Sequence, residues 1–137
     1  MLPINQYLMT TNERKIYEKL KKRLYPKYEV FPQIPLRAIL KRNFNPYKYT
    51  KTEKMMYKIV DFLICEKPYY KPVLIVEVND ETHEEWERRV RDSNVTIALK
   101  EMGLPIWMLL PEQNYKNPEE MNLNKHIELM IKTWLNF

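Results

Sequence analysis

The sequence predicts an α/β fold in which a mixed β-sheet carries helices on both faces. Two observations support this prediction: the order of the expected elements, and two carboxylates set inside short apolar segments. The expected order is helix, strand, strand, strand, helix, strand, helix. A hairpin followed by a strand that is reached through a helix gives a mixed sheet between helical layers. The 137 residues are expected to form one domain, 1–137.

The first helix is expected over residues 10–24. Apolar residues recur at four-residue spacing from Ile16 to Leu24, which is typical of a helix with one buried face. Thr10 and Glu13 have the spacing of a capping box, in which each residue satisfies a backbone N–H of the other. The helix should therefore begin at this pair.

Three short strands are expected next. The first, over 28–36, contains prolines that indicate an edge position or an irregular end, and its Gln33 is either exposed or in polar contact with a site. The other two, over 58–65 and 72–78, are apolar runs bounded by Lys, Pro or Asn. Their short connection predicts an antiparallel hairpin. The stretch 41–56 is expected to be a polar, aromatic loop.

Two helices and one strand are expected in the last third of the chain. A helix over 84–102 should end at Gly103, a favourable left-handed cap. The apolar run 106–110 predicts a central strand in parallel pairing, and a last helix should cover 119–135. The side chains expected to face the core are Trp86, Val90, Ile97 and Ala98 in the first of these helices, and Leu123, Ile127, Met130, Ile131 and Trp134 in the last.

Asp61 and Glu77 are the main candidates for a functional site. Each lies inside a buried-type strand, where an ionised carboxylate without a partner is costly. For either acid alone, a salt bridge to one of the many Lys or Arg side chains is the better explanation. Together, on neighbouring strands, they favour a site with oxygen ligands for a hard cation such as Mg²⁺.

Positive charge is concentrated in the first 58 residues. These carry 14 Lys and Arg against 4 Asp and Glu, whereas the remainder carries 9 against 14. In the stretch 41–51, cations alternate with aromatic residues, which suits a phosphate backbone with stacked bases, although a solvated Lys-rich loop has the same composition. Beside an acidic metal site, the basic flank favours a polyanionic substrate. The cations in question are Lys41, Arg42, Lys48 and Lys51.

Other classes of site are excluded by composition. The single glycine, Gly103, removes the P-loop and the glycine-rich dinucleotide motif. The single cysteine, Cys65, removes an internal disulfide and a cysteine-rich zinc site, and it is expected to be a core residue. Two histidines, His83 and His126, are too few and too separated for a His-based zinc site. No apolar run reaches the ~18 residues of a membrane span, and no signal pattern precedes the first helix, so a cytoplasmic protein that does not enter a membrane is expected.

The order of elements and the paired acids resemble the restriction-endonuclease-like, PD-(D/E)XK nuclease superfamily. In that superfamily an Asp and an E-x-K tripeptide lie on adjacent strands, after a helix that carries a Glu. More narrowly, the chain resembles the bacterial family called domain of unknown function 2726, which is similar to very-short-patch-repair-type endonucleases and is often attached to DNA-processing proteins. The resemblance covers roughly 11–110. The matching segments are Asn12-Glu13-Arg14, Phe31-Pro32-Gln33-Ile34, Val60-Asp61-Phe62, Val76 to His83, Arg91-Asp92 and Gly103-Leu104-Pro105.

The resemblance implies a restriction-endonuclease-like three-layer α/β/α sandwich with a central mixed β-sheet, and metal-dependent cleavage of DNA. It implies that Asp61 and Glu77 bind Mg²⁺ or Mn²⁺, with the Val78 carbonyl as a third ligand. It also implies that Glu13 orients the attacking water or completes the shell of a second metal. Reciprocal capping with Thr10 explains Glu13 equally well.

Asn79 departs from the superfamily pattern, which has Lys at this place. A Lys ammonium can position water and offset charge on the phosphate, whereas an amide supplies only a hydrogen bond. Arg91, Lys58 and His83 are the candidates for a substitute cation, and Arg91 is expected to contact phosphate. His83, near the expected start of the second helix, could transfer a proton or contact phosphate, or simply bond to Asp80.

Two classes of function follow from these observations. The first is a divalent-metal-dependent nuclease whose partner is nucleic acid, with DNA favoured. The second is a catalytically weak nuclease-like module that binds nucleic acid or a protein partner. The basic flank and the retained acids favour the first class, and Asn79 favours the second. A small interaction module with a structural acid pair would need neither metal nor basic flank. A homodimer is one arrangement that would address both strands of a duplex.

Overall fold

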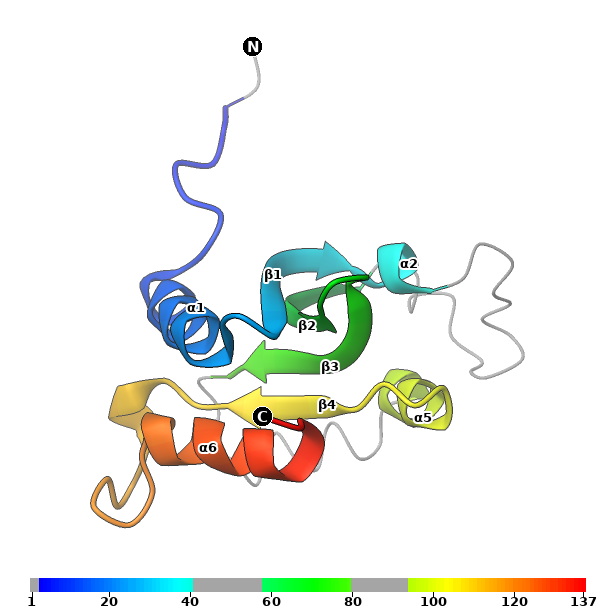
Figure 1. Cartoon of the computed structure of the whole chain (residues 1–137). Coiled ribbons are helices and arrows are strands. Elements are labelled where there is room, and N and C mark those ends of the chain that lie inside the picture. The colour runs from blue at the N-terminus through cyan, green and yellow to red at the C-terminus, as the bar shows by residue number, and fades with distance from the viewer. Residues whose placement is uncertain (1–2, 41–57, 80–93) are drawn as a thin grey trace.

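The computed structural model describes residues 3–40, 58–79 and 94–137 of the chain. In this part of the chain, four strands form one open sheet in the order β1-β2-β3-β4 (Figure 1). The first three strands pair antiparallel, and β3 pairs parallel with β4, so the sheet is mixed and the fold is α/β as expected. The strands are β1 (Tyr28–Pro35), β2 (Ile59–Glu66), β3 (Lys71–Val78) and β4 (Ile106–Leu109).

Helices cover both faces of this sheet, which confirms the expected layering. Successive side chains of a strand point to opposite faces. Phe62 of β2 belongs to a core that includes residues of α1 and α6, whereas the next residue, Leu63, belongs to a second core with residues of α2 and α5. The helices are α1 (Thr11–Leu24), α2 (Leu36–Ile39), α5 (Asn94–Glu101), the 3₁₀ helix η2 (Glu112–Asn114) and α6 (Leu123–Trp134).

Helix α1 begins and packs as its sequence predicts. Thr10 is the N-cap, and both hydrogen bonds of the capping box with Glu13 are present. Ile16, Leu20 and Leu24 are buried against the sheet. The local sequence therefore determines both where α1 starts and which face it buries.

The hairpin of β2 and β3 is also confirmed. Its register shifts between Ile64 and Cys65, beside the turn. Cys65 is a core residue as expected, with 3% of its surface exposed. Burial, with a contribution from nearby Glu29, raises the pKa of this thiol to about 11, so Cys65 stays protonated and unreactive at neutral pH.

Strand β4 pairs as predicted but holds a different position in the sheet. Gly103 follows α5 with a φ of 80°, the left-handed cap that was expected. Beyond it, β4 runs parallel to β3 but lies at an edge of the described sheet, so the expectation of a central strand is wrong. Met108 and Leu109 are nevertheless buried, and both belong to the core that includes residues of α1 and α6. Its apolar composition therefore reflects burial by helices and not central pairing.

Two predicted core residues are exposed instead. Ile97 of α5 is 46% exposed and Trp134 of α6 is 48% exposed, while Leu99 and Leu135 take the inward positions. Each helix turns its apolar stripe slightly away from the face that spacing alone suggested. The other core residues expected in α6 are buried. The side chains of Trp86, Val90 and Ala98, the predicted loop 41–56 and the first part of the predicted helix 84–102 lie outside the described part.

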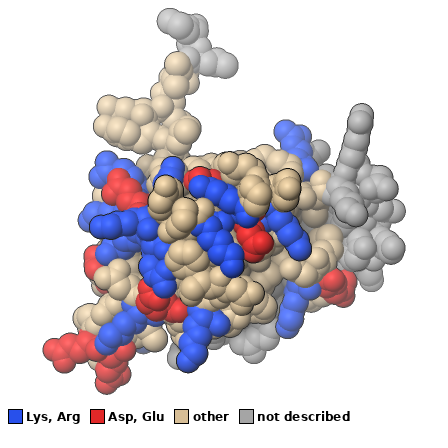
Figure 2. Space-filling view, in the orientation of Figure 1, with Lys and Arg blue, Asp and Glu red and all other residues tan. Residues whose placement is uncertain are grey.

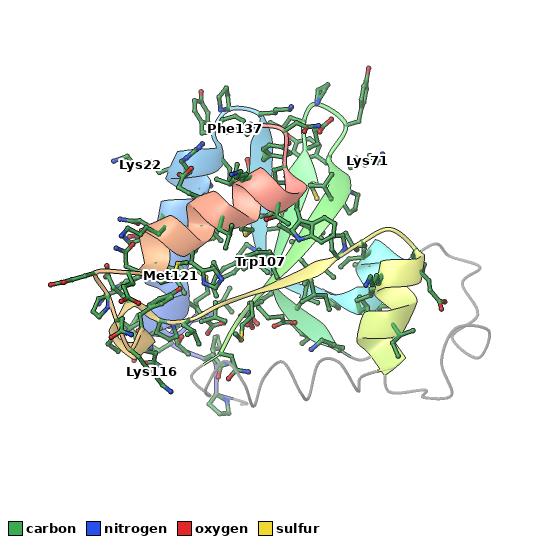
Figure 3. The ribbon with its side chains drawn as sticks, turned by 90° about the horizontal axis from the view of Figure 1, so that it is seen from below. Lys22, Lys71, Trp107, Lys116, Met121 and Phe137 are labelled. Atoms are coloured by element: carbon green, nitrogen blue, oxygen red, sulfur yellow. The ribbon has the colours of Figure 1, made fainter. Side chains whose placement is uncertain are left out.

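A buried polar group in α6 was not predicted. His126 is 8% exposed, and its Nδ1 lies 3.0 Å from the Tyr115 hydroxyl. Trp107 of β4 packs against the His126 ring, with 5.5 Å between ring centroids (Figure 3). His126 thus joins α6 to β4 through the Trp107 ring and to the segment after η2 through the Tyr115 hydroxyl. Within the described ranges, none of the helices has the length and apolar character to cross a membrane.

Candidate functional site

The end of the β2–β3 pair brings Asp61 and Glu77 together. Phe62 pairs with Val76, and the same register places Asp61 opposite Glu77 one residue further on. Residues opposite one another on antiparallel strands are close neighbours. The backbone N–H of Val78 donates a 2.8 Å hydrogen bond to Asp61 Oδ2, which holds this carboxylate against β3. The expected proximity of the two acids is therefore present.

Glu77 is a largely buried carboxylate beside a lysine. Its side chain is only 13% exposed, and its Oε1 lies 3.3 Å from the ammonium nitrogen of Lys58. This Oε1 is buried and has no hydrogen bond, so the contact with Lys58 is an ion pair without directional bonding. One carboxylate oxygen thus keeps a lone pair available for a further partner.

The surroundings of Glu77 favour its protonated form. Burial raises the pKa of Glu77 to about 7; Lys58 opposes this rise and the neighbouring Asp61 carboxylate adds to it. Loss of hydration disfavours the charged form, and a second carboxylate repels it. Without a bound cation, the two acids therefore hold a proton at Glu77 up to near-neutral pH.

This raised pKa predicts a stability that falls with pH. Between pH 4.5 and about 7 the folded protein keeps a proton on Glu77 that the unfolded chain has lost, so the free energy of unfolding decreases as pH rises through this window. The loss is on the order of 3 kcal/mol, since one pKa unit corresponds to ~1.4 kcal/mol. Glu77→Gln should remove this dependence and make the protein more stable than wild type at pH 8, with little difference at pH 4.

Urea unfolding in EDTA at pH 4, 6 and 8 measures this effect. Glu120→Gln, at an exposed position, is the matched control and should leave the pH dependence unchanged. If Glu77→Gln were less stable than wild type at pH 8, the attraction to Lys58 would outweigh burial, and the pKa of Glu77 would be lowered by folding instead of raised.

Glu13 of α1 bonds to Gln33 of β1, which lies in the cross-strand row that contains Asp61 and Glu77. Glu13 Oε1 accepts from the Thr10 backbone N–H at 2.9 Å, and Glu13 Oε2 accepts from Gln33 Nε2 at 3.0 Å. Gln33 has a φ of 55°, a conformation that is uncommon for a residue other than glycine. The β1–β2 register places Gln33 opposite Asp61, although the two do not form a regular pair. The capping role of Glu13 is thus present, and its role at a metal stays a prediction.

The remaining predicted ligands flank the acid pair. Val78 uses its N–H to hold Asp61, and its carbonyl as a metal ligand stays a prediction. The backbone N–H of Asn79 donates to the Leu109 carbonyl at 3.1 Å, which fixes this residue at the end of the β3–β4 pair. Within the described residues, no group of three or more His, Cys, Asp or Glu side chains gathers around one point. The candidate site there is a pair of carboxylates.

Several predicted site residues lie outside the described ranges: His83, Arg91, Lys41, Arg42, Lys48 and Lys51. Among the three substitute cations suggested by the sequence, Lys58 is the one in the described part, and it contacts Glu77 directly. The bond between Gln33 and Glu13 was not predicted. The signal in the sequence is one polar residue on each of three strands, Gln33, Asp61 and Glu77. That these three lie in one row across the sheet is known only once the strand register is known.

The protein is thus an α/β protein with a mixed sheet. Two of its neighbouring strands carry paired carboxylates, and one of these lies beside a lysine. Over residues 5–127 the chain matches the model of a family described as protein of unknown function (DUF2726), and it belongs to that family. No curated protein and no solved structure shows significant similarity to the chain.

Proposed function

We propose that this protein is a divalent-metal-dependent nuclease with a restriction-endonuclease-like α/β/α fold, which hydrolyses phosphodiester bonds of DNA. The observation that supports this proposal is the Asp61–Glu77 pair. The pair lies at the end of two neighbouring strands, and Glu77 carries a buried oxygen without a hydrogen bond. Burying a carboxylate oxygen without a hydrogen bond lowers stability, and such groups occur more often at functional sites such as cation sites than as structural contacts.

The residues present fit a hard divalent cation. Asp61 uses Oδ2 to accept from Val78, which orients the carboxylate. The buried Oε1 of Glu77 faces a cation already, the Lys58 ammonium. Carboxylate and carbonyl oxygens are the ligands that Mg²⁺ and Mn²⁺ prefer. Asp61, Glu77 and the Val78 carbonyl are therefore the proposed ligands of Mg²⁺ or Mn²⁺.

Each side chain around the pair has a separate proposed role in hydrolysis. Bound Mg²⁺ would polarise a phosphoryl oxygen and lower the pKa of water. Lys58, released from Glu77, supplies the positive charge that Asn79 lacks and offsets charge on the attacked phosphate. Asn79 donates a hydrogen bond, and Glu13 orients the attacking water. His83 is proposed to protonate the leaving oxygen.

Contacts to the rest of the nucleic acid are assigned to cations outside the described ranges. Basic side chains that neutralise phosphates give affinity that depends steeply on salt. A homodimer would bring two sites to the two strands of a duplex. The proposed contacts are Lys41, Arg42, Lys48, Lys51 and Arg91.

A catalytically weak, nuclease-like binding module is the second candidate. Its supporting observation is that the Lys58 ammonium lies 3.3 Å from Glu77 Oε1 and can serve as the partner of this carboxylate. In such a module the acid pair and Lys58 would be a structural group, and the surface would bind nucleic acid or a protein partner.

Cleavage assays on three forms of DNA test the proposal. Single-stranded, duplex and mismatched DNA are incubated with the purified protein in Mg²⁺, in Mn²⁺ and in EDTA, and Glu77→Ala is assayed beside the wild type. We expect metal-dependent cleavage that is lost in Glu77→Ala. Equal activity in the variant would point to another site or a contaminant. No cleavage by wild type, with DNA binding in EDTA, would replace the nuclease by the binding module.

A further inference from the structure

Three lysines on the outer surface of α1 form a row in which none makes an ion pair with a neighbouring acid among the described residues, although Glu18 lies beside it. Lys15, Lys19 and Lys22 follow each other at spacings of four and three residues, so they lie along one side of the helix. Within the described part of the chain, none of the three forms an ion pair, in contrast to their neighbours Lys21 and Arg23, which pair with Glu29 and Glu128. We call Lys15, Lys19 and Lys22 the lysine row.

The three ammonium groups of the lysine row repel one another, because like charges one helical turn apart are unfavourable. Lys19 donates to Asn124 of α6 at 3.1 Å, a neutral partner that leaves its charge in place. Lys and Arg side chains gather over α1 in the space-filling view (Figure 2). A row of this kind is stabilised by an extended polyanion laid along the helix.

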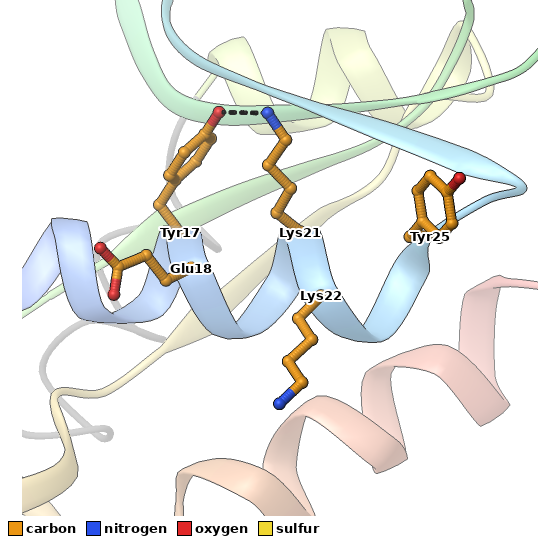
Figure 4. Close-up of a pocket in the computed structure, with 5 residues that line it drawn as sticks. All are labelled: Tyr17, Glu18, Lys21, Lys22 and Tyr25. Carbon is orange, nitrogen blue, oxygen red and sulfur yellow. Dashed lines mark hydrogen bonds between the residues drawn. The ribbon is translucent and has the colours of Figure 1, made fainter.

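Two hollows lie on either side of this row. One, of about 480 Å³, lies between α1 and α6 and is lined by Lys19, Lys22, Arg23, Asn124, Ile127 and Glu128, of which Arg23 and Glu128 pair with each other. The other, of about 420 Å³, is lined by Tyr17, Glu18, Lys21, Lys22 and Tyr25 of α1 (Figure 4). Lys22 borders both hollows, so it stands on the ridge that separates them.

The second hollow offers an aromatic ring for stacking. Tyr25 is 70% exposed, and the Lys67 ammonium lies 5.4 Å from its ring centroid. Tyr17 at the other end stacks on Phe62 with 6.0 Å between centroids, and its hydroxyl accepts from Lys21 at 3.2 Å. Tyr17 is thus fixed by the core, whereas Tyr25 is largely exposed and has the Lys67 ammonium over one face of its ring, which leaves the other face for stacking.

We propose that the outer surface of α1 binds single-stranded nucleic acid, with phosphates along the lysine row and a base stacked on Tyr25. Cations that follow a backbone beside an accessible aromatic ring are the combination by which proteins bind single strands. The row spans about 10 Å along the helix, at 1.5 Å per residue. A duplex would present its phosphates to the row but would keep its bases stacked away from Tyr25, and an acidic peptide would use the lysines alone.

The first turn of α1 contacts the strand that neighbours Asp61. Glu13, in the first turn of α1, bonds to Gln33, which lies opposite Asp61 in the register. The lysine row begins two residues after Glu13, on the opposite side of the helix from the residues buried against the sheet. For its biological role the inference rests on the proposed function, since the bound segment would be the single-stranded flank of the substrate. Binding itself requires no metal.

Binding in EDTA separates this inference from cleavage. Fluorescence anisotropy with a labelled oligothymidylate of about 16 nucleotides, a length that covers the usual site sizes, is measured over a range of salt. The triple variant Lys15→Gln, Lys19→Gln, Lys22→Gln should bind at least about tenfold more weakly. Its slope of log affinity against log salt should fall by roughly 2, since each phosphate contact to a single strand contributes about 0.7.

The matched control removes the same charge elsewhere. Lys71, Lys116 and Lys132 are exposed and form no ion pair among the described residues; Lys71 and Lys116 are labelled in Figure 3. Their triple Gln variant should keep most of the affinity. Tyr25→Leu should weaken binding about tenfold with an unchanged salt slope, because stacking releases no ions. Thermal unfolding of each variant verifies that it is folded.

Three outcomes would overturn the inference. Equal losses in the two triple variants would make the effect one of net charge. Duplex bound as tightly as the single strand, with no effect of Tyr25→Leu, would remove the stacked base. Displacement of the oligonucleotide by polyglutamate at equal charge would indicate an acidic protein partner. Specific binding by a wild type that cleaves no DNA would keep this inference and reject the nuclease.

Discussion

Asp61→Asn and Glu77→Gln are each expected to abolish DNA cleavage while the protein stays folded. Both substitutions keep the size of the side chain and remove the charge that attracts a cation. The rate should fall at least about a thousandfold, because polarisation by a metal ion is worth several kcal/mol and each ~1.4 kcal/mol is tenfold. Asp61→Asn can still accept from the Val78 N–H through its amide oxygen, so the strand end should remain in place.

Metal binding gives this prediction a second measurement. Calorimetric titration with Mn²⁺ should show at least about tenfold weaker binding for each variant, since a charged ligand has been lost. Glu66→Gln is the matched control, because Glu66 lies at the opposite end of β2 from Asp61. Cleavage that survives in Asp61→Asn with unchanged Mn²⁺ affinity would remove Asp61 from the site and leave the acid pair as a structural group.

Lys58→Met is expected to separate catalysis from metal binding. The ammonium lies 3.3 Å from Glu77 Oε1, and it is the cation nearest to the pair in the described part of the chain. If it offsets charge on the phosphate, cleavage should slow by about a hundredfold, the range found when one stabilising donor is removed from a transition state. Mn²⁺ affinity should be kept or increased, because the competing ammonium is gone.

The same substitution should change stability in a way that depends on pH. Without Lys58, the Glu77 carboxylate loses the interaction that lowers its pKa, so its charged form becomes still less favourable. Lys58→Met should therefore be less stable than wild type at pH 8 in EDTA and close to wild type at pH 4. Added Mn²⁺ should recover part of the difference, since a ligand that binds only the folded state stabilises it.

Asn79→Lys in the Lys58→Met background completes this test. Asn79 follows Val78 at the end of β3, so a lysine there could reach the same phosphate from the neighbouring strand. We expect this change to restore part of the lost rate, and Lys58→Arg to retain more activity than Lys58→Met. Full activity in Lys58→Met alone would limit Lys58 to holding Glu77 in the metal-free protein.

Features that depend on local chain geometry were predictable from the sequence. The capping box of Thr10 and Glu13, the apolar stripe of α1, the β2–β3 hairpin and the left-handed Gly103 all follow from residues a few positions apart. Helix periodicity alone was less reliable for orientation. Ile97 and Trp134 lie at the margin of their apolar stripes, and packing against the sheet turned both toward solvent.

The site itself needed the tertiary structure. The sequence indicated that Asp61 and Glu77 lie on neighbouring strands, because both acids interrupt apolar runs joined by a short turn. Whether the two acids lie directly opposite each other depends on the strand register. A shift of the register by one residue would separate them. The register also brings Lys58 to Glu77, and the packing of α1 on the sheet brings Gln33 to Glu13. These contacts join segments far apart in the chain, so local patterns determined the elements and their buried acids, and only the packing of strands and helix decided which side chains meet.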